Sequence, residues 1–345
     1  MTGIRALAEQ LNISIGTVSR ALNDRPGVNP ETRARVMEMA LRTGYVANAA
    51  GRNLRKGMTQ TIGLMIGTGH GATAGGDNFF MAVTDSMQKV MQTEGVDLIL
   101  LPCHSEMNPV DFLRRTLTRG TLDGIILTAT RRQDPRVALL LETHLPFMTL
   151  GRSETPGDFL WMDLDFEGAA RQAVTRLASH GHRRIAVGVP AGDANLSHLY
   201  RDAWAAAMTD LGLSAGADLS FVEEASEAGG ARVAARIVAA PDRPTAMLMC
   251  SEPMISGFYG GLINNGLRPG PDMSVIGFRQ SPLLRHLAPP ISCFDIDLDQ
   301  LGRHMAESIL TLVYNPAAPH PAPKISPMSY IETASVQAPK NDVVD

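Results

Sequence analysis

The sequence has few cysteines, few aromatic residues and no long apolar run. Its three cysteines, Cys103, Cys250 and Cys293, lie far apart and fit no metal-binding spacing, and in a reducing compartment we expect them to be small buried side chains. No stretch approaches the roughly 18 apolar residues of a membrane span, and the first residues lack the basic-then-apolar pattern of an export signal. These absences argue against a secreted or membrane protein and favour a cytoplasmic one.

Motifs for catalysis and for cofactor binding are also missing. The segment Gly67-Thr68-Gly69-His70-Gly71 follows an expected strand, but it lacks the spacing of a dinucleotide-binding loop, so we interpret it as a loop. His180 and His182 lie at the end of an expected helix, where histidine interacts favourably with the helix dipole, which favours a structural role over metal binding. No carboxylate pair or Ser/His/Asp set stands in a recognisable context. The sequence therefore predicts no enzyme, no cofactor and no metal site.

Short amphipathic helices are expected at the start of the chain. Apolar residues recur every three or four positions over residues 4–11, and residues 12–14 interrupt the pattern. Ser14 is placed to cap a second short helix. Two helices joined by so tight a turn predict a helix-turn-helix, and Asn29-Pro30 then begins a third helix that runs to Gly44-Tyr45.

The outward side chains of the second helix suit contact with DNA. They are small, hydroxylated or basic, and such residues at a helix N-terminus let the backbone approach a phosphodiester, while Arg20 can reach the O6 and N7 atoms of guanine. Base readout is expected from Ile15, Gly16 and Arg20. The full set of expected DNA contacts in this region is Ser14, Ile15, Gly16, Thr17, Ser19, Arg20 and Asn23.

Charge is distributed unevenly along the chain. Residues 1–57 contain nine basic and four acidic side chains, a net charge of +5, whereas the remaining residues carry −9, which gives −4 overall. A basic first segment on an acidic body is typical of a protein of which only that segment touches a polyanion. The charge pattern therefore supports DNA as the partner of the helix-turn-helix.

Residues 48–58 connect the basic segment to the rest of the chain. A helix here would be shorter than the ~12–15 residues that an isolated helix needs in water, so we expect it to order only on DNA. Asn48 is placed as its cap, and Arg52 and Arg55 are placed to neutralise phosphates. Leu54 is a large apolar residue with no core to enter, which is typical of a wedge between base steps in the minor groove.

From residue 61 onward, short apolar runs alternate with amphipathic stretches. Four runs between residues 62 and 150 and a second set between 184 and 278 predict buried parallel strands with helices between them. This pattern predicts two α/β lobes in tandem, with ligands bound beyond the carboxyl ends of the strands. The predicted domains are a helix-turn-helix (1–47), a hinge (48–58), a two-lobed body (59–335) and a polar tail (336–345).

The headpiece and the body both resemble a known family. Residues 13–23, 29–33 and 44–48 look like the DNA-binding headpiece of the LacI-type family of bacterial transcription regulators, and body segments such as 123–126 and 274–278 are also similar to that family. The resemblance covers nearly the whole chain. It implies an all-α headpiece, a body with the fold of periplasmic sugar-binding proteins, a homodimer, and a small sugar-like effector that changes operator affinity.

Candidate effector-binding residues stand mainly beyond the expected strand ends. Phe79 or Phe80 can stack on a sugar ring, and Arg152 can make paired hydrogen bonds to hydroxyls or to a carboxylate. The alternative is that the phenylalanines belong to the core and that the acidic residues cap helices. Tyr200 occupies a position at which the resembled family commonly has arginine. This difference leaves the identity of the effector open. The full set is Asp77, Phe79, Phe80, Arg152, Asp163, Asp165, Tyr200, Arg201 and Glu252.

The sequence thus predicts a dimeric transcription regulator that binds double-stranded operator DNA and responds to a sugar or sugar derivative. We expect it to repress transcription. It is expected in the cytoplasm, on the nucleoid when bound to its operator. Two alternatives come from other classes. A solute-binding protein of similar fold needs an export signal and no headpiece, and an enzyme with a DNA-binding appendage would turn over a bound sugar.

Overall fold

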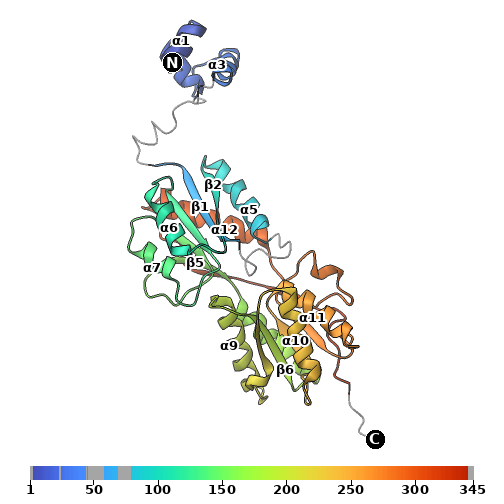
Figure 1. Cartoon of the computed structure of the whole chain (residues 1–345). Helices are drawn as coiled ribbons and strands as arrows, with labels where there is room; N and C mark the ends of the chain where they lie inside the picture. The colour runs from blue at the N-terminus through green and yellow to red at the C-terminus, as the bar shows by residue number, and fades with distance from the viewer. Residues whose placement is uncertain (1–2, 23–24, 44, 46–57, 69–78, 341–345) are drawn as a thin grey trace. The chain divides into compact units, whose positions relative to one another are not determined.

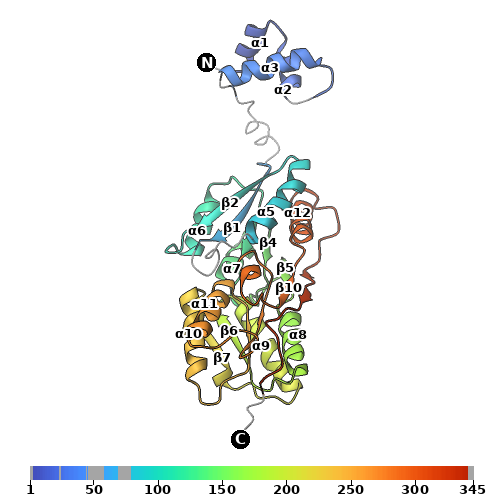
Figure 2. The ribbon, with the colours of Figure 1, turned by 90° about the vertical axis from the view of Figure 1, so that its right-hand side faces the viewer.

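The computed structural model describes residues 3–22, 25–43, 45, 58–68 and 79–340. The chain divides into two compact units, Met1–Thr59 and Gln60–Asp345, and each is described by itself. Figures 1 and 2 show both units in two orthogonal views. Of the predicted hinge at 48–58, only Met58 lies within the described residues.

The described part of the first unit contains α1 (Ile4–Leu11), α2 (Ile15–Leu22) and α3 (Pro30–Thr43). Leu7, Val18 and Val36 are among the buried residues that join the three helices in one core. Asn12 ends α1 in the left-handed conformation, with φ 51°, and its amide donates to carbonyls of α1. Because α2 begins only three residues later, the two helices form the predicted helix-turn-helix, and this prediction is confirmed.

The first lobe of the second unit contains a six-stranded sheet in the order β11-β5-β4-β3-β1-β2, in which every pair is parallel. Helices cover both faces, so the central strands are buried throughout rather than on alternate residues. Helix α5 packs against α12 on one face, and α6 packs against α7 on the other (Figure 2). The elements are β1 (Thr61–Gly67), α5 (Phe79–Thr93), β2 (Asp97–Cys103), α6 (Pro109–Thr118), β3 (Gly124–Thr128), α7 (Pro135–Leu141), β4 (Phe147–Leu150), β5 (Leu160–Leu164), α12 (Leu298–Tyr314) and β11 (Lys324–Ser326).

The second lobe repeats this plan with a four-stranded parallel sheet in the order β7-β6-β8-β9. Helices α8 and α9 pack together on one face, and α10 and α11 pack together on the other (Figure 2). The elements are α8 (Phe166–Ser179), β6 (Ile185–Pro190), α9 (Asn195–Asp210), the 3-10 turn η1 (Ala217–Leu219), β7 (Ser220–Glu223), α10 (Glu227–Ala239), β8 (Ala246–Met249), α11 (Glu252–Asn264), β9 (Ser274–Gly277) and the 3-10 turn η2 (Leu284–His286).

The two lobes are not consecutive in the sequence, which corrects the tandem arrangement that the pattern predicted. After the second lobe the chain returns to the first as α12 and β11, and it then pairs β12 (Ser329–Ile331) with β10 (Cys293–Asp295) in a two-stranded antiparallel sheet. The chain therefore passes between the lobes at three points. Such a connection allows the lobes to change their separation without unfolding either one.

The residues assigned to a polar tail begin within the packed body. Val336 is buried, and the carbonyl oxygen of Gln337 accepts hydrogen bonds from the Ser274 hydroxyl, at 2.9 Å, and from the His182 ring, at 2.8 Å. Packing against the second lobe therefore continues past residue 335. The apolar residue at 336 gives the only sequence signal for this extension.

Candidate functional site: a DNA-reading helix and a cleft between two lobes

The N-terminus of α2 is built by the side chains that precede and begin it. The backbone amide of Thr17 donates to Ser14 Oγ at 3.0 Å, and the two hydroxyls lie 2.9 Å apart. This capping fixes the first turn of α2 and leaves Ile15 45% exposed. Arg20 lies along the same face, with its Nη2 3.4 Å from Thr17 Oγ1.

Gly16 is not required by the packing of the headpiece. A Cβ added there would meet only Arg20 Nη1 and Ser14 Oγ, each at 3.7 Å, which is ordinary contact. The glycine therefore leaves bare backbone on an exposed helix start, where a phosphate can approach closely. The structure places six of the expected DNA-contact residues on this surface: Ser14, Ile15, Gly16, Thr17, Ser19 and Arg20. Asn23, Asn48, Arg52, Leu54 and Arg55 lie outside the described residues.

A cavity of about 180 Å³ lies between the lobes of the second unit. This volume holds roughly a dozen water molecules, which is also the scale of a monosaccharide. Five of the predicted effector-binding residues line it: Phe79, Phe80, Arg152, Asp163 and Glu252. Arg152 follows β4 and Glu252 follows β8, as the strand-end rule predicts, whereas Asp163 lies within β5 and the two phenylalanines begin α5. The role of all five as ligand contacts stays a prediction.

Three other predicted effector-binding residues do not line the cavity. Asp165 caps α8, with its Oδ1 accepting from the Gly168 amide at 2.8 Å. Tyr200 is fully buried behind Phe278, with ring centroids 5.9 Å apart at an interplanar angle of 85°. The Arg201 side chain points toward His198 and Asp202 instead. Asp77 lies outside the described residues.

Sequence reasoning missed several residues that line the cavity. Phe166 and Phe278 stack with ring centroids 4.4 Å apart and planes within 10°, which joins the start of α8 to the end of β9. Asn195, the first residue of α9, also lines the cavity, as does Arg279. All of these positions follow or begin an element beside a strand end, so the strand-end rule applied to every strand would have found them.

One ion-pair network positions Arg152 at the cavity wall. Its Nε lies 3.0 Å from Asp163 Oδ2, and its Nη2 lies 2.6 Å from Glu167 Oε2. Burial opposes the charged form of Arg152, but the hydrogen bonds that it donates to Glu167 and Asp163 outweigh burial and raise the pKa of Arg152. Burial also raises the pKa of Asp163, against the hydrogen bonds that Arg152 donates. Arg152 therefore stays charged and held in one geometry.

A second ion pair lies on the opposite lobe. Glu252 Oε2 lies 3.7 Å from Arg279 Nη2, and Glu252 Oε1 accepts from the Ser281 hydroxyl at 2.5 Å. The Arg279 guanidinium also lies over the Phe79 ring, 4.9 Å from its centroid. Because Phe79 belongs to the first lobe and Arg279 to the second, this contact closes the cavity from both sides.

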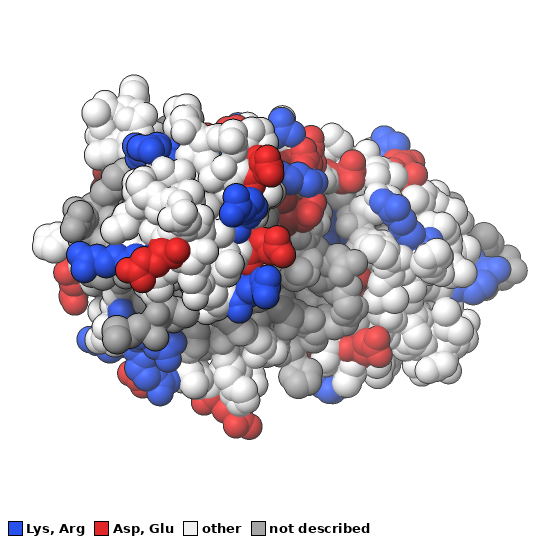
Figure 3. Space-filling model, turned by 90° about the horizontal axis from the view of Figure 1, so that it is seen from above, with Lys and Arg blue, Asp and Glu red and all other residues white. Residues whose placement is uncertain are grey.

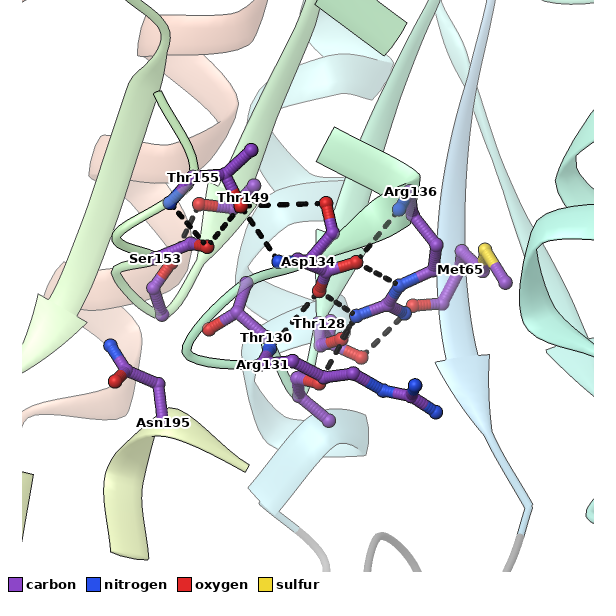
Figure 4. A network of polar contacts seen from close by, with 12 residues as sticks. Met65, Thr128, Thr130, Arg131, Asp134, Arg136, Thr149, Ser153, Thr155 and Asn195 are labelled. Atoms are coloured by element: carbon purple, nitrogen blue, oxygen red, sulfur yellow. Dashed lines mark hydrogen bonds and ion pairs between the residues drawn. The ribbon is translucent and has the colours of Figure 1, made fainter. Parts of the chain in front are cut away.

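The loop after β3 holds the lobes together beside the cavity (Figure 4). Asp134 is buried and pairs with Arg136, whose Nη2 lies 2.7 Å from Asp134 Oδ2 and also donates to the Thr128 and Ala129 carbonyls. Burial opposes ionisation of Asp134, but the hydrogen bond and charge of Arg136 outweigh it and lower the pKa of that carboxyl. The loop is thereby fixed, and its Thr130 carbonyl accepts from the Asn195 amide of the second lobe at 2.9 Å.

The fold and these two sites define a class of protein in which a helix-turn-helix accompanies a two-lobed small-molecule-binding body. Residues 4–48 match the family model described as bacterial regulatory proteins, lacI family, and residues 174–336 match the periplasmic binding protein-like domain. The regulator AglR of Rhizobium meliloti is 30% identical over 316 residues, which cover 90% of this chain and 88% of AglR. The chain belongs to the LacI family of transcriptional regulators, and its relatives are regulators rather than enzymes.

Other relatives and solved structures support the same assignment. The regulator RafR of Escherichia coli is 32% identical over 220 residues, covering 61% of this chain and 62% of RafR. A lac repressor dimer bound to operator has a TM-score of 0.81 at 20% identity, covering 98% of this chain and 99% of that one. A CelR–cellobiose complex has a TM-score of 0.73 at 23% identity, covering 97% and 100%. At these identities the structures show the shared fold.

The described residues hold no membrane-spanning helix, since none of their helices is both long and apolar enough. Those residues also bring together no group of three or more His, Cys, Asp or Glu side chains that could hold a metal ion. The three cysteines are free thiols, and Cys250 is only partly buried because it lines the cavity.

Proposed function

We propose that the exposed start of α2 reads operator DNA and that a ligand in the cavity changes operator affinity. Two observations together carry this proposal. The start of α2 is capped and exposed, with Arg20 in the last turn of the same helix, and the cavity is lined by aromatic and paired charged residues. In this arrangement Ile15, Gly16 and Arg20 face the base edges. Thr17 and Ser19 face phosphates.

A homodimer is part of the proposal, because a near-palindromic operator needs two headpieces. The lac repressor neighbour is a dimer bound to operator. In this chain the edge strand β2 carries Ile99, 44% exposed, and the neighbouring helix α5 carries Met81, 55% exposed. A second copy that covered these apolar side chains would remove them from water.

A sugar-like ligand is the effector class that we propose. Relatives include a ribose operon repressor, and one structural neighbour is a complex with cellobiose. Aromatic rings at the cavity suit the C–H face of a sugar, and the paired side chains suit its hydroxyls. We further propose that operator binding represses transcription, that the protein is cytoplasmic, and that it is associated with the nucleoid when the operator is bound.

The coupling between the sites is proposed to run through residues 48–58. If this segment orders only on DNA, a ligand that changes the separation of the lobes changes the free energy of ordering it. A coupling of ~1–3 kcal/mol alters operator affinity about 5- to 150-fold.

Leu54→Ala tests the proposed hinge. We expect the variant to weaken operator binding strongly while leaving ligand affinity unchanged, because the leucine acts as a wedge in the minor groove only when DNA is bound. Fluorescence anisotropy of a labelled operator and calorimetry of the ligand measure the two affinities. An operator affinity equal to that of the unsubstituted protein would contradict the role of the hinge.

Binding selection from genomic fragments tests the proposed function as a whole. The purified protein is expected to enrich a near-palindromic sequence, and ligands that shift its melting temperature are expected to change that affinity. A protein that enriches no fragment at low salt, with or without ligand, would contradict the proposal. Turnover of the ligand would favour the enzyme alternative instead.

A further inference from the structure

Asn195 lines the cavity and carries a buried hydrogen-bond acceptor, its side-chain oxygen. The residue is 2% exposed, and its Nδ2 donates to the Arg152 carbonyl at 2.8 Å. A carbonyl only accepts, so the amide nitrogen must face Arg152 and the oxygen must face away. Within the part of the chain that the structure describes, Asn195 Oδ1 is buried and has no donor. A buried amide oxygen without a donor is costly, so a bound molecule that donates to it is favoured.

The charged residues of the lining neutralise one another. Among the described residues, the cavity is lined by two cations, Arg152 and Arg279, and two anions, Asp163 and Glu252. Each cation lies within ion-pair distance of an anion of the lining, and Arg152 also pairs with Glu167. A carboxylate or phosphate that entered would lose its hydration and find each cation already engaged.

The partial positive charge of a helix N-terminus favours anions, but at three helix starts beside the cavity a carboxylate or carbonyl already interacts with this charge. Helices α8, α9 and α11 begin with Phe166, Asn195 and Glu252, all of which line the cavity. Asp165 caps α8, and Glu252 itself supplies a carboxylate at the start of α11. The first amide of α9 donates to the Thr130 carbonyl. At these three helix starts the dipole therefore adds little attraction for a further anion.

From these observations we infer that the ligand of this cavity is uncharged and that Asn195 selects it by accepting a hydrogen bond from one of its hydroxyl groups. The inference rests on the proposed function, because it narrows the class of molecule that the same cavity binds. The inference also links ligand binding to a contact that joins the two lobes. Asn195 belongs to the second lobe and donates to the first through Nδ2, so a ligand that engages its Oδ1 contacts the bridge between the lobes.

Matched pairs of neutral and anionic sugars test the charge preference. The probes are ribose with ribose 5-phosphate, galactose with galacturonate, and cellobiose with cellobionate, each followed by thermal shift and calorimetry on the intact protein. We expect at least one neutral sugar to raise the melting temperature and its anionic partner to bind at least tenfold more weakly. An anion that binds as tightly as its neutral partner, or a series in which no neutral sugar binds, overturns the inference.

A double-mutant cycle tests the role of Asn195. Asn195→Leu is expected to weaken binding of the neutral sugar about tenfold, and removing one particular hydroxyl from that sugar is expected to cost a similar factor in the unsubstituted protein but not in the variant. Asn264→Leu, at an exposed position of α11, is the matched control. Equal losses for every deoxy sugar in both proteins would mean that Asn195 acts only on the fold and would overturn its assignment.

Two further measurements keep these outcomes separable. Asn195→Ser, which retains a hydroxyl acceptor, enters the same cycle if the leucine variant does not fold. Operator titration of the same preparations reports on the proposed function independently of the ligand class. Retained operator binding with a response to anions only would refute the inference while leaving the DNA-binding function intact.

Discussion

At the scale of single residues, the proposed DNA-reading surface depends on side chains that the headpiece does not need for packing. Arg20 is exposed, and within the described residues its side chain makes one long hydrogen bond, to Thr17, so its basic character suits a partner outside the chain. Gly16 likewise has space for a Cβ. Residues that packing does not require are the ones at which a substitution changes binding without changing stability.

Arg20→Ala is therefore expected to cost ~1–3 kcal/mol of operator binding and to relax specificity at one base pair. The reason is the loss of paired hydrogen bonds to a base edge. Anisotropy titrations on the operator and on single-base variants of it measure the effect. Arg119→Ala, exposed in the body, is the control. Equal losses on operator and random DNA would show that Arg20 contacts phosphates only.

His182 gives a prediction about pH. Its Nε2 lies 2.8 Å from the Gln337 carbonyl and its Nδ1 lies 2.7 Å from Thr245 Oγ1. Burial lowers the pKa of His182, and the neighbouring His180 lowers it further, against the Gln337 hydrogen bond. Because the unfolded chain then binds the proton more readily, stability is complete above the unfolded pKa of about 6.5 and is lost as pH falls toward the lower folded pKa.

Replacing the imidazole ring of His182 is expected to make the stability of the protein less dependent on pH. His182→Gln should show a smaller fall in melting temperature between about pH 7 and pH 5 than the unsubstituted protein, whatever its absolute stability. His144→Gln, at an exposed position, serves as the control and should keep the original slope. An unchanged slope in His182→Gln would remove His182 as the source of the pH dependence.

At the scale of secondary-structure elements, the close pair α10 and α11 positions one wall of the cavity. A Cβ added at Gly257 would lie 1.8 Å from the Glu227 carbonyl oxygen, so this glycine is required by the approach of the two backbones. Helix α11 begins at Glu252, which lines the cavity. The close packing of α10 on α11 therefore fixes the position of Glu252 at the cavity.

Gly257→Ala is expected to destabilise the second lobe by about 1–3 kcal/mol or more and to weaken ligand binding, because α11 must move away from α10. Gly260→Ala on the same helix is the matched control, since a Cβ there meets nothing within 4 Å. That control should be neutral or slightly stabilising. Denaturant unfolding and calorimetry measure both effects. A Gly257→Ala protein as stable as the control would contradict the packing account.

The sequence predicted most elements because their signals are local. Apolar runs marked β1 and β6, and the Asn12-Ile13-Ser14 break marked the turn before α2. It did not predict β5, β10, β11 or β12, since β10–β12 are only three residues long, and strand pairing depends on contacts between distant segments. Among the candidate cavity residues, too, those with a local sequence signal were placed correctly at the cavity and those that depend on tertiary packing were not. Arg152 followed from its strand end, whereas the burial of Tyr200 behind Phe278 depends on tertiary packing.

At the scale of the whole molecule, the charge distribution separates the two functions. Figure 3 shows acidic and basic side chains interspersed over the face it presents, and many arginines of the body pair with nearby carboxylates, such as Arg171 with Asp210 and Arg184 with Asp218. The net positive charge lies in residues 1–57. Attraction to DNA is thus concentrated in the segment that contains the helix-turn-helix.

We propose that one chain binds operator DNA and that an uncharged ligand in its body changes the operator affinity. The most direct measurement is anisotropy of a labelled operator titrated with the intact protein, with and without the neutral sugar that raises its melting temperature. The account predicts an affinity change of about 5- to 150-fold on operator and a reciprocal change in sugar affinity when operator is present. Identical operator affinity with and without the bound sugar would contradict it.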